Sequence, residues 1–68
     1  MNREALKSSN IRSAGYDSET QTLEIEFTSG VYIYTDVPET VWATFKAANS
    51  KGAFFAKNIK GKYQARRA

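Results

Sequence analysis

An alternating stretch over residues 22–28 limits the fold of this chain more than any other feature of its sequence. Its apolar side chains fall on one side of an extended chain, while Glu24 and Glu26 fall on the other, which is typical of a half-buried β-strand. Residues 29–30, Ser-Gly, offer a tight turn, and residues 31–35 are β-branched or aromatic. The two stretches together predict an antiparallel hairpin.

The length of the hairpin loop decides which face its two tyrosines join. With a two-residue loop, Tyr32 and Tyr34 share the apolar face of the first strand, and Val31 and Ile33 lie on the acidic face. A three-residue loop with a bulge at Gly30 reverses this assignment. We expect the two-residue loop, because it gives one continuous apolar face for helices to cover. The opposing pairs expected from it are Phe27 with Tyr32 and Ile25 with Tyr34.

The segments on either side of the hairpin predict the rest of an α+β fold. Residues 11–17 and the polar turn after them indicate a further strand. Asp36 fits the N-cap of a first helix with Pro38 in its first turn, and Ser50 fits the N-cap of a second. Apolar residues recur at helical spacing in both, namely Val37, Val41, Phe45 and Ala48, then Phe55, Ile59 and Tyr63. The predicted fold is a three-stranded antiparallel meander followed by two C-terminal helices packed on one sheet face.

The chain has 68 residues, which fits a single domain over residues 1–68. We expect its core to span about residues 8–63 and residues 64–68 to form a frayed basic tail. Cysteine and histidine are absent, so disulfides, thiolate metal sites and the commonest general base are excluded. We therefore expect no metal, no cofactor and no enzymatic activity. No stretch resembles a signal peptide or a membrane span, which favours a cytoplasmic protein without a membrane partner.

Charge is divided unevenly along the chain. Glu39 is the last acidic residue, and residues 40–68 carry seven Lys and Arg residues interleaved with aromatic ones. Such a segment favours RNA or another phosphate-bearing polyanion, because cations displace counterions from phosphates and aromatic faces stack on bases. The candidate contact residues are Ser50, Lys51, Gly52, Phe54, Lys57, Lys60, Lys62, Arg66 and Arg67.

Each part of this candidate site also has an ordinary structural explanation. Residues 50–52 place backbone N–H groups where a phosphate could bind, but they could equally be a plain helix cap with a surface lysine. The cations from Lys57 onward could be a solvated helix face and tail. Tyr32 and Tyr34 are expected in the core, which leaves Phe54 as the better candidate for stacking on a base.

The acidic face of the hairpin suggests a different class of function. Glu24 and Glu26 could be read as a carboxylate pair, but a solvated sheet face explains their alternation. Val31 and Ile33 would leave apolar surface next to these acids. These four residues predict an alternative function in protein interaction, with an acidic partner, a second copy of the chain or, in a phage, a host protein.

A set of residues spread over most of the chain resembles one known family. In chain order they are Ser8, Ser9, Ile11, Gly15, Tyr16, Asp17, Leu23, Ile25, Phe27, Gly30, Tyr32, Tyr34, Val37, Pro38, Ala48, Ser50, Gly52, Phe55, Ile59 and Tyr63. This order is similar to that of the KTSC domain, a small module found at the C-terminus of some lysyl-tRNA synthetases and as single-domain bacterial and phage proteins. The resemblance implies that fold, and the synthetase context suggests RNA binding.

Two residues depart from the family's usual pattern. Ala56 stands where an Asn usually follows the Phe of the second helix, and Gln64 stands where Pro often follows the final Tyr. A ligand contact or cap made by that Asn is therefore absent from this chain. The resemblance bears on the fold more than on the function.

Overall fold

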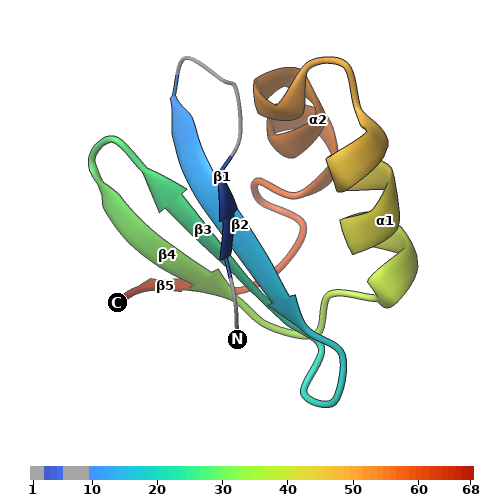
Figure 1. The fold of residues 1–68 in the computed structure, drawn as a ribbon. Helices are drawn as coiled ribbons and strands as arrows, with labels where there is room; N and C mark the ends of the chain where they lie inside the picture. Colours follow the sequence, from blue (N-terminus) through green and yellow to red (C-terminus); the bar gives the residue numbers. More distant parts are fainter. Residues whose placement is uncertain (1–2, 6–9) are drawn as a thin grey trace.

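The computed structural model describes residues 3–5 and 10–68, and within them it contains one antiparallel sheet and two helices. The strands are β1 (Arg3–Ala5), β2 (Ile11–Asp17), β3 (Thr22–Phe27), β4 (Gly30–Tyr34) and β5 (Ala65–Arg67), and the helices are α1 (Glu39–Ala47) and α2 (Lys51–Asn58). The strands lie in the sheet in chain order, and both helices lie on the same face (Figure 1). The α+β class and the two helices on one face agree with the sequence prediction. Ser8 and Ser9 lie outside the described residues.

The predicted number of strands is wrong, because short strands extend the sheet at both edges. β1 pairs with β2 on one side, and β5 pairs with β4 on the other. The supposed frayed tail therefore contains a strand, and backbone hydrogen bonds hold it on either side: the Thr35 N–H donates to Gln64 O (3.1 Å) and the Ala68 N–H donates to Val31 O (2.9 Å). Side-chain alternation could not reveal β5, since its residues are all exposed and its backbone hydrogen bonds have no sequence signature.

The hairpin of β3 and β4 has the predicted faces but a different register. Its two-residue loop is Thr28-Ser29 and not Ser29-Gly30, so Ile25 pairs with Tyr32 and Leu23 pairs with Tyr34. The pairing differs from the predicted one by two residues, and such a slip leaves every side chain on its original face. Tyr34 is accordingly buried and Tyr32 half-buried on the face that the helices cover.

The two helices begin differently. Asp36 is not the N-cap of α1: it has a positive φ of 58°, and Pro38 occupies the N-cap position without a side-chain cap. Ser50 caps α2 as predicted, since its Oγ accepts a hydrogen bond of 3.2 Å from the Ala53 N–H. α2 ends at Asn58, so the apolar repeat of this segment continues beyond the helix, with Ile59 at the C-cap position.

The core lies between the sheet and the helices. Its buried members are Ile11, Ala14, Leu23, Ile25, Tyr34, Val37, Trp42, Phe45 and Ile59. Phe55 of α2 meets the sheet edge-on, with ring centroids 5.0 Å from Phe27 and 5.7 Å from Tyr34. Trp42 of α1 stacks on Tyr16 of β2, 5.9 Å between centroids. These contacts hold each helix against a different part of the sheet. Among the described residues, no helix is long and apolar enough to cross a membrane.

Candidate nucleic-acid interface

Most of the polar groups at the start of α2 make hydrogen bonds within the fold. The Ser50 Oγ is engaged with the Ala53 N–H, and the Lys51 Nζ donates to the carbonyl of Ala48, 2.5 Å away. That carbonyl follows the last turn of α1, where carbonyl groups have no partner within the helix. Lys51 therefore acts here as a capping cation for α1, a contact that neither the phosphate site nor the plain surface lysine considered for residues 50–52 includes.

Gly52 lies apart from these capping contacts, beside a cation from further along the chain. Together with Lys60 it lines a hollow of about 210 Å³ between α2 and the ends of β2 and β3. Ala56 lines the same hollow. The structure thus brings Gly52 and Lys60 together.

Three lysines of the basic segment are exposed around the end of α2. Lys57 lies in the last turn of the helix, and Lys60 and Lys62 follow in the turn after it. The chain changes direction there, with Gly61 at a φ of 76° and the Lys62 N–H donating to Ile59 O (3.0 Å). The three cations therefore project from one short segment, although Lys60 and Lys62 do not belong to a helix face.

Arg66 and Arg67 lie on opposite faces of the sheet because they are consecutive residues of a strand. Arg67 is on the helix-covered face, where its Cζ lies 5.9 Å from the Tyr32 ring centroid. Its Nη2 donates a 2.8 Å hydrogen bond to Ser29 O across the hairpin loop. Arg67 therefore anchors β5 to the β3–β4 hairpin, a role the sequence did not indicate.

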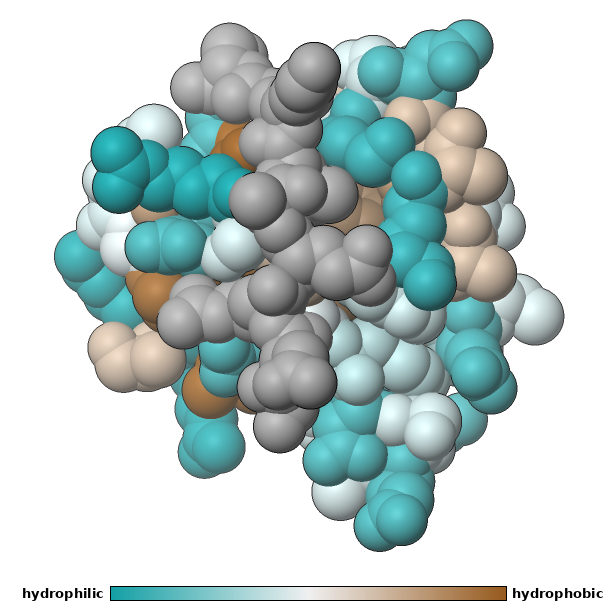
Figure 2. Space-filling view, viewed as in Figure 1, coloured by the Kyte–Doolittle hydropathy of each residue, from teal (hydrophilic) through white to brown (hydrophobic). Residues whose placement is uncertain are grey.

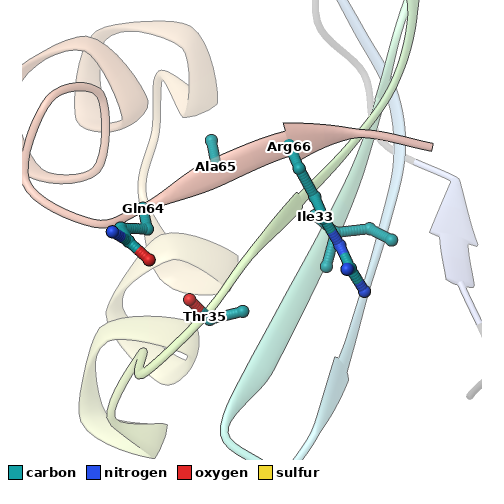
Figure 3. Close-up of a pocket in the computed structure, with 5 residues that line it drawn as sticks. All are labelled: Ile33, Thr35, Gln64, Ala65 and Arg66. Atoms are coloured by element: carbon teal, nitrogen blue, oxygen red, sulfur yellow. The ribbon is translucent and has the colours of Figure 1, made fainter.

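Arg66 lies on the outer face, which is the face opposite the helices. It pairs with Ile33 of β4, and the two side chains border a shallow hollow of about 480 Å³ with Thr35, Gln64 and Ala65 (Figure 3). Arg66 therefore lies on the face opposite the one that α2 covers (Figure 1). The nine predicted contact residues consequently do not form one surface.

The four residues predicted as a protein interface do lie together on the outer face. Glu24 pairs with Ile33 and Glu26 pairs with Val31, and all four are half-buried. The Ser13 Oγ donates a 2.9 Å hydrogen bond to Glu26 Oε1. Figure 2 shows part of the sheet side of the molecule, where small apolar areas are separated by hydrophilic ones. The outer face is therefore a mixed surface in which acids alternate with apolar side chains.

A groove between the two helices was not found from the sequence. It has a volume of about 320 Å³ and is lined by Thr40, Val41, Thr44, Phe54, Asn58 and Tyr63. Only Phe54 was a predicted contact residue, and it is half-buried with its ring 6.0 Å from that of Phe45. The sequence signal that could have indicated the groove is the spacing of Phe54 and Asn58, which places both on one side of α2.

The family model of the KTSC domain matches residues 7–63. The chain belongs to the KTSC domain family. A solved KTSC domain protein from Yersinia pestis superposes with a TM-score of 0.97 at 44% sequence identity, over 98% of this chain and 96% of that one. The resemblance stated from the sequence is thereby confirmed.

KTSC relatives occur both as small proteins and within a larger enzyme. An uncharacterized protein of Stutzerimonas stutzeri is 50% identical over 56 residues, which cover 81% of this chain and 79% of that protein. A lysine–tRNA ligase of Trichormus variabilis is 51% identical over 55 residues, covering 79% of this chain. That match spans only 10% of the ligase. β5 lies beyond the residues matched by the family model.

Proposed function

We propose that this KTSC domain is a non-catalytic module that binds RNA, or another phosphate-bearing polyanion, through the cations at the end of α2. The observation that carries the proposal is the exposure of Lys57, Lys60 and Lys62 on one short segment within an acid-free stretch, residues 40–68. Cations grouped in this way attract phosphates without reading sequence. The same domain in a lysine–tRNA ligase gives RNA as the first polyanion to test.

The structure narrows the set of residues proposed for this role. Ser50, Lys51 and Arg67 make contacts within the fold, and Arg66 faces the other side of the sheet. The proposed phosphate contacts are therefore Lys57, Lys60 and Lys62, with Gly52 adjoining Lys60. Their contacts would be to the phosphate backbone, and the affinity would fall as salt is added.

The test is the salt dependence of RNA binding. Fluorescence anisotropy of a labelled, mixed-sequence single-stranded RNA is measured at several salt concentrations for the wild type and for Lys57→Gln/Lys60→Gln/Lys62→Gln. We expect weaker binding by the variant and a flatter plot of log affinity against log salt, by about 0.7 for each phosphate that the variant no longer neutralises. The control, Arg12→Gln/Lys46→Gln, removes two exposed cations elsewhere, so the slopes are compared per cation removed. Equal slopes in the wild type and the triple variant, or no binding at low salt, would refute the proposal.

A second candidate function is docking of a protein on the outer face. The observation that favours it is the hollow beside Ile33 and Arg66, next to the row of half-buried acids and apolar residues. NMR separates the two functions. RNA binding predicts chemical-shift changes around residues 57–62, whereas docking of a protein predicts them at Glu24, Glu26, Val31 and Ile33.

A further inference from the structure

The groove between α1 and α2 adjoins the cations at the end of α2. Lys57 directly precedes Asn58, and Lys62 directly precedes Tyr63, and both Asn58 and Tyr63 line the groove. A phosphate held by these lysines would therefore bring the rest of its nucleotide to the groove.

The groove exposes aromatic surface that is not buried in the core. Phe54 and Tyr63 are half-buried, so part of each ring packs against the core and part remains accessible. Val41 is also half-buried and adds an aliphatic side chain. Flat apolar surface next to cations is the combination on which single-stranded nucleic acids place their bases.

The groove also has hydrogen-bonding capacity to spare. The Asn58 Nδ2 donates to Phe54 O (3.2 Å), which fixes the orientation of the amide because a carbonyl needs a donor. The Asn58 Oδ1 is then left as an acceptor beside the groove, together with a second N–H. The Thr44 hydroxyl donates to Thr40 O (2.8 Å) and keeps its capacity to accept. Polar groups of this kind can pair with the edge of a base.

The charges next to the groove favour one kind of occupant. All six lining residues are uncharged, and Lys57 and Lys62 are the chain neighbours of two of them, whereas Glu39 precedes Thr40 at the other end. An occupant with negative charge next to a flat, partly polar ring is therefore favoured over a cationic or purely aliphatic one. A nucleotide has this combination, whereas an acidic peptide has the charge without the ring.

We infer that the groove between α1 and α2 binds an unpaired base of single-stranded RNA, stacked on Phe54 and Tyr63 and hydrogen-bonded by Asn58, while Lys57 and Lys62 hold the adjoining phosphates. This inference rests on the proposed function and adds a base-contacting site to it. The domain then distinguishes single-stranded RNA from a plain polyphosphate chain. Arg66 and the outer face take no part in this binding.

The test compares three probes by two-dimensional ¹H–¹⁵N NMR: a mixed-sequence RNA octamer, inorganic polyphosphate and poly-glutamate. We expect the Asn58 side-chain amide and the backbone amides of Phe54 and Tyr63 to shift with RNA and not with polyphosphate. Phe54→Leu, which keeps an apolar side chain against the core, should weaken RNA binding about fivefold or more and leave polyphosphate binding unchanged. The matched control is Tyr32→Leu, a half-buried aromatic that lines neither the groove nor the hollow of Lys60, which should leave RNA affinity unchanged.

The remaining outcomes separate this inference from the proposed function. If the backbone amides of residues 57–62 shift with RNA and polyphosphate while the Asn58 side-chain amide and the backbone amide of Phe54 stay in place, the groove is not a base site and the proposed function stands. Groove shifts with poly-glutamate equal to those with RNA would overturn the base site in favour of a protein partner. If neither RNA nor polyphosphate binds, both proposals fail. A titration with adenosine monophosphate that leaves the Asn58 side-chain amide unshifted would separately show that the groove binds no base. Asn58→Ala, a change at an exposed residue, replaces Phe54→Leu if the latter does not fold.

Discussion

The hydroxyl of Tyr16 on β2 donates a 2.5 Å hydrogen bond to the backbone carbonyl of Val37, in the connection between β4 and α1. The Val37 N–H donates in turn to Gln21 O (2.9 Å), so both backbone groups of Val37 are bonded to other parts of the fold. The Tyr16 ring also stacks on Trp42 of α1. Tyr16 therefore links the sheet to the start of the first helix.

Replacing Tyr16 by Phe removes this hydrogen bond and keeps the aromatic stacking. We expect Tyr16→Phe to lower the free energy of unfolding by about 1 kcal/mol, because the Val37 carbonyl loses its donor. Urea denaturation measures the change. Tyr63→Phe, at a half-buried tyrosine of the groove, is the control and should change the stability by less. Equal effects of the two variants would show that the Tyr16 hydroxyl has no special role.

Stability should fall in alkaline solution because two tyrosines are harder to ionise in the folded chain. Burial raises the pKa of Tyr34 above 10.0, with a further contribution from Tyr32, and desolvation, then the charges of Glu39 and Asp17, raise the pKa of Tyr16. A raised pKa in the folded state stabilises the fold fully below pH 10. The contribution is lost as the pH rises through the pKa of the folded state.

The expected result is a urea midpoint that declines above about pH 10, the ordinary tyrosine pKa. Lysines titrate in the same range, so the comparison that isolates the buried tyrosine is between the wild type and Tyr34→Phe. The variant should lose less stability than the wild type between pH 9 and pH 11. The same loss in both would contradict the assignment to Tyr34.

Arg67 and Gly30 should be coupled in their effects on stability. A Cβ added at Gly30 would lie 3.0 Å from Arg67 Nη2 and 3.1 Å from its Nε, and Gly30 also has a positive φ of 150°. Gly30→Ala should therefore cost about 1 kcal/mol or more, from backbone strain and from displacement of the guanidinium. Arg67→Gln should cost about 0.5–1 kcal/mol, since it removes the contact with Tyr32 and the hydrogen bond to Ser29.

A double-mutant cycle tests this coupling. The combined variant should lose less stability than the two single variants together, because both changes remove the same Arg67 contacts. Arg66→Gln is the control on the other face of the strand and should alter stability by no more than about 0.5 kcal/mol. Strict additivity of Gly30→Ala and Arg67→Gln would contradict the anchoring role of Arg67.

Ile59 should behave as a core residue although it lies at the C-cap of α2. Its side chain is fully buried, so Ile59→Val should lower the free energy of unfolding by about 0.5–1.5 kcal/mol. Ile33→Val, the same change at a half-buried site on the outer face, should cost less than half as much. Thermal and urea unfolding of both variants provide the comparison, and a larger cost at Ile33 would reverse our assignment of the core.

The sequence predicted those parts of the fold that side-chain periodicity controls. The faces of the hairpin followed from alternation together with the expected two-residue loop. They are unchanged by a register that differs by two residues, because side chains in a strand repeat with that period. The cap of α2 followed from Ser50, whose hydroxyl lies next to the N–H groups that it satisfies. Asp36 has the same capping chemistry, but Val37 is held by Gln21 and Tyr16, and those distant contacts set the chain direction there.

The remaining features depend on contacts between distant segments. β5 has no apolar pattern, since it joins the sheet through its backbone, and Arg67 is engaged with a loop far from it in sequence. The groove exists because α1 and α2 pack side by side, so its lining combines residues from both helices and the turn that follows. Composition indicated a basic segment, and only the fold showed that its arginines and lysines face different ways.

The pairing of β4 with β5 has a consequence for the order of folding. Every other strand pair joins neighbours in the chain through a short connection, whereas Tyr34 and Ala65 are paired across a segment that contains both helices. Contacts between distant residues form late, because closing a long loop costs entropy before the contact contributes. We therefore expect the β2–β3–β4 meander to assemble first and β5 to dock last, so that formation of the final strand reports completion of the whole domain.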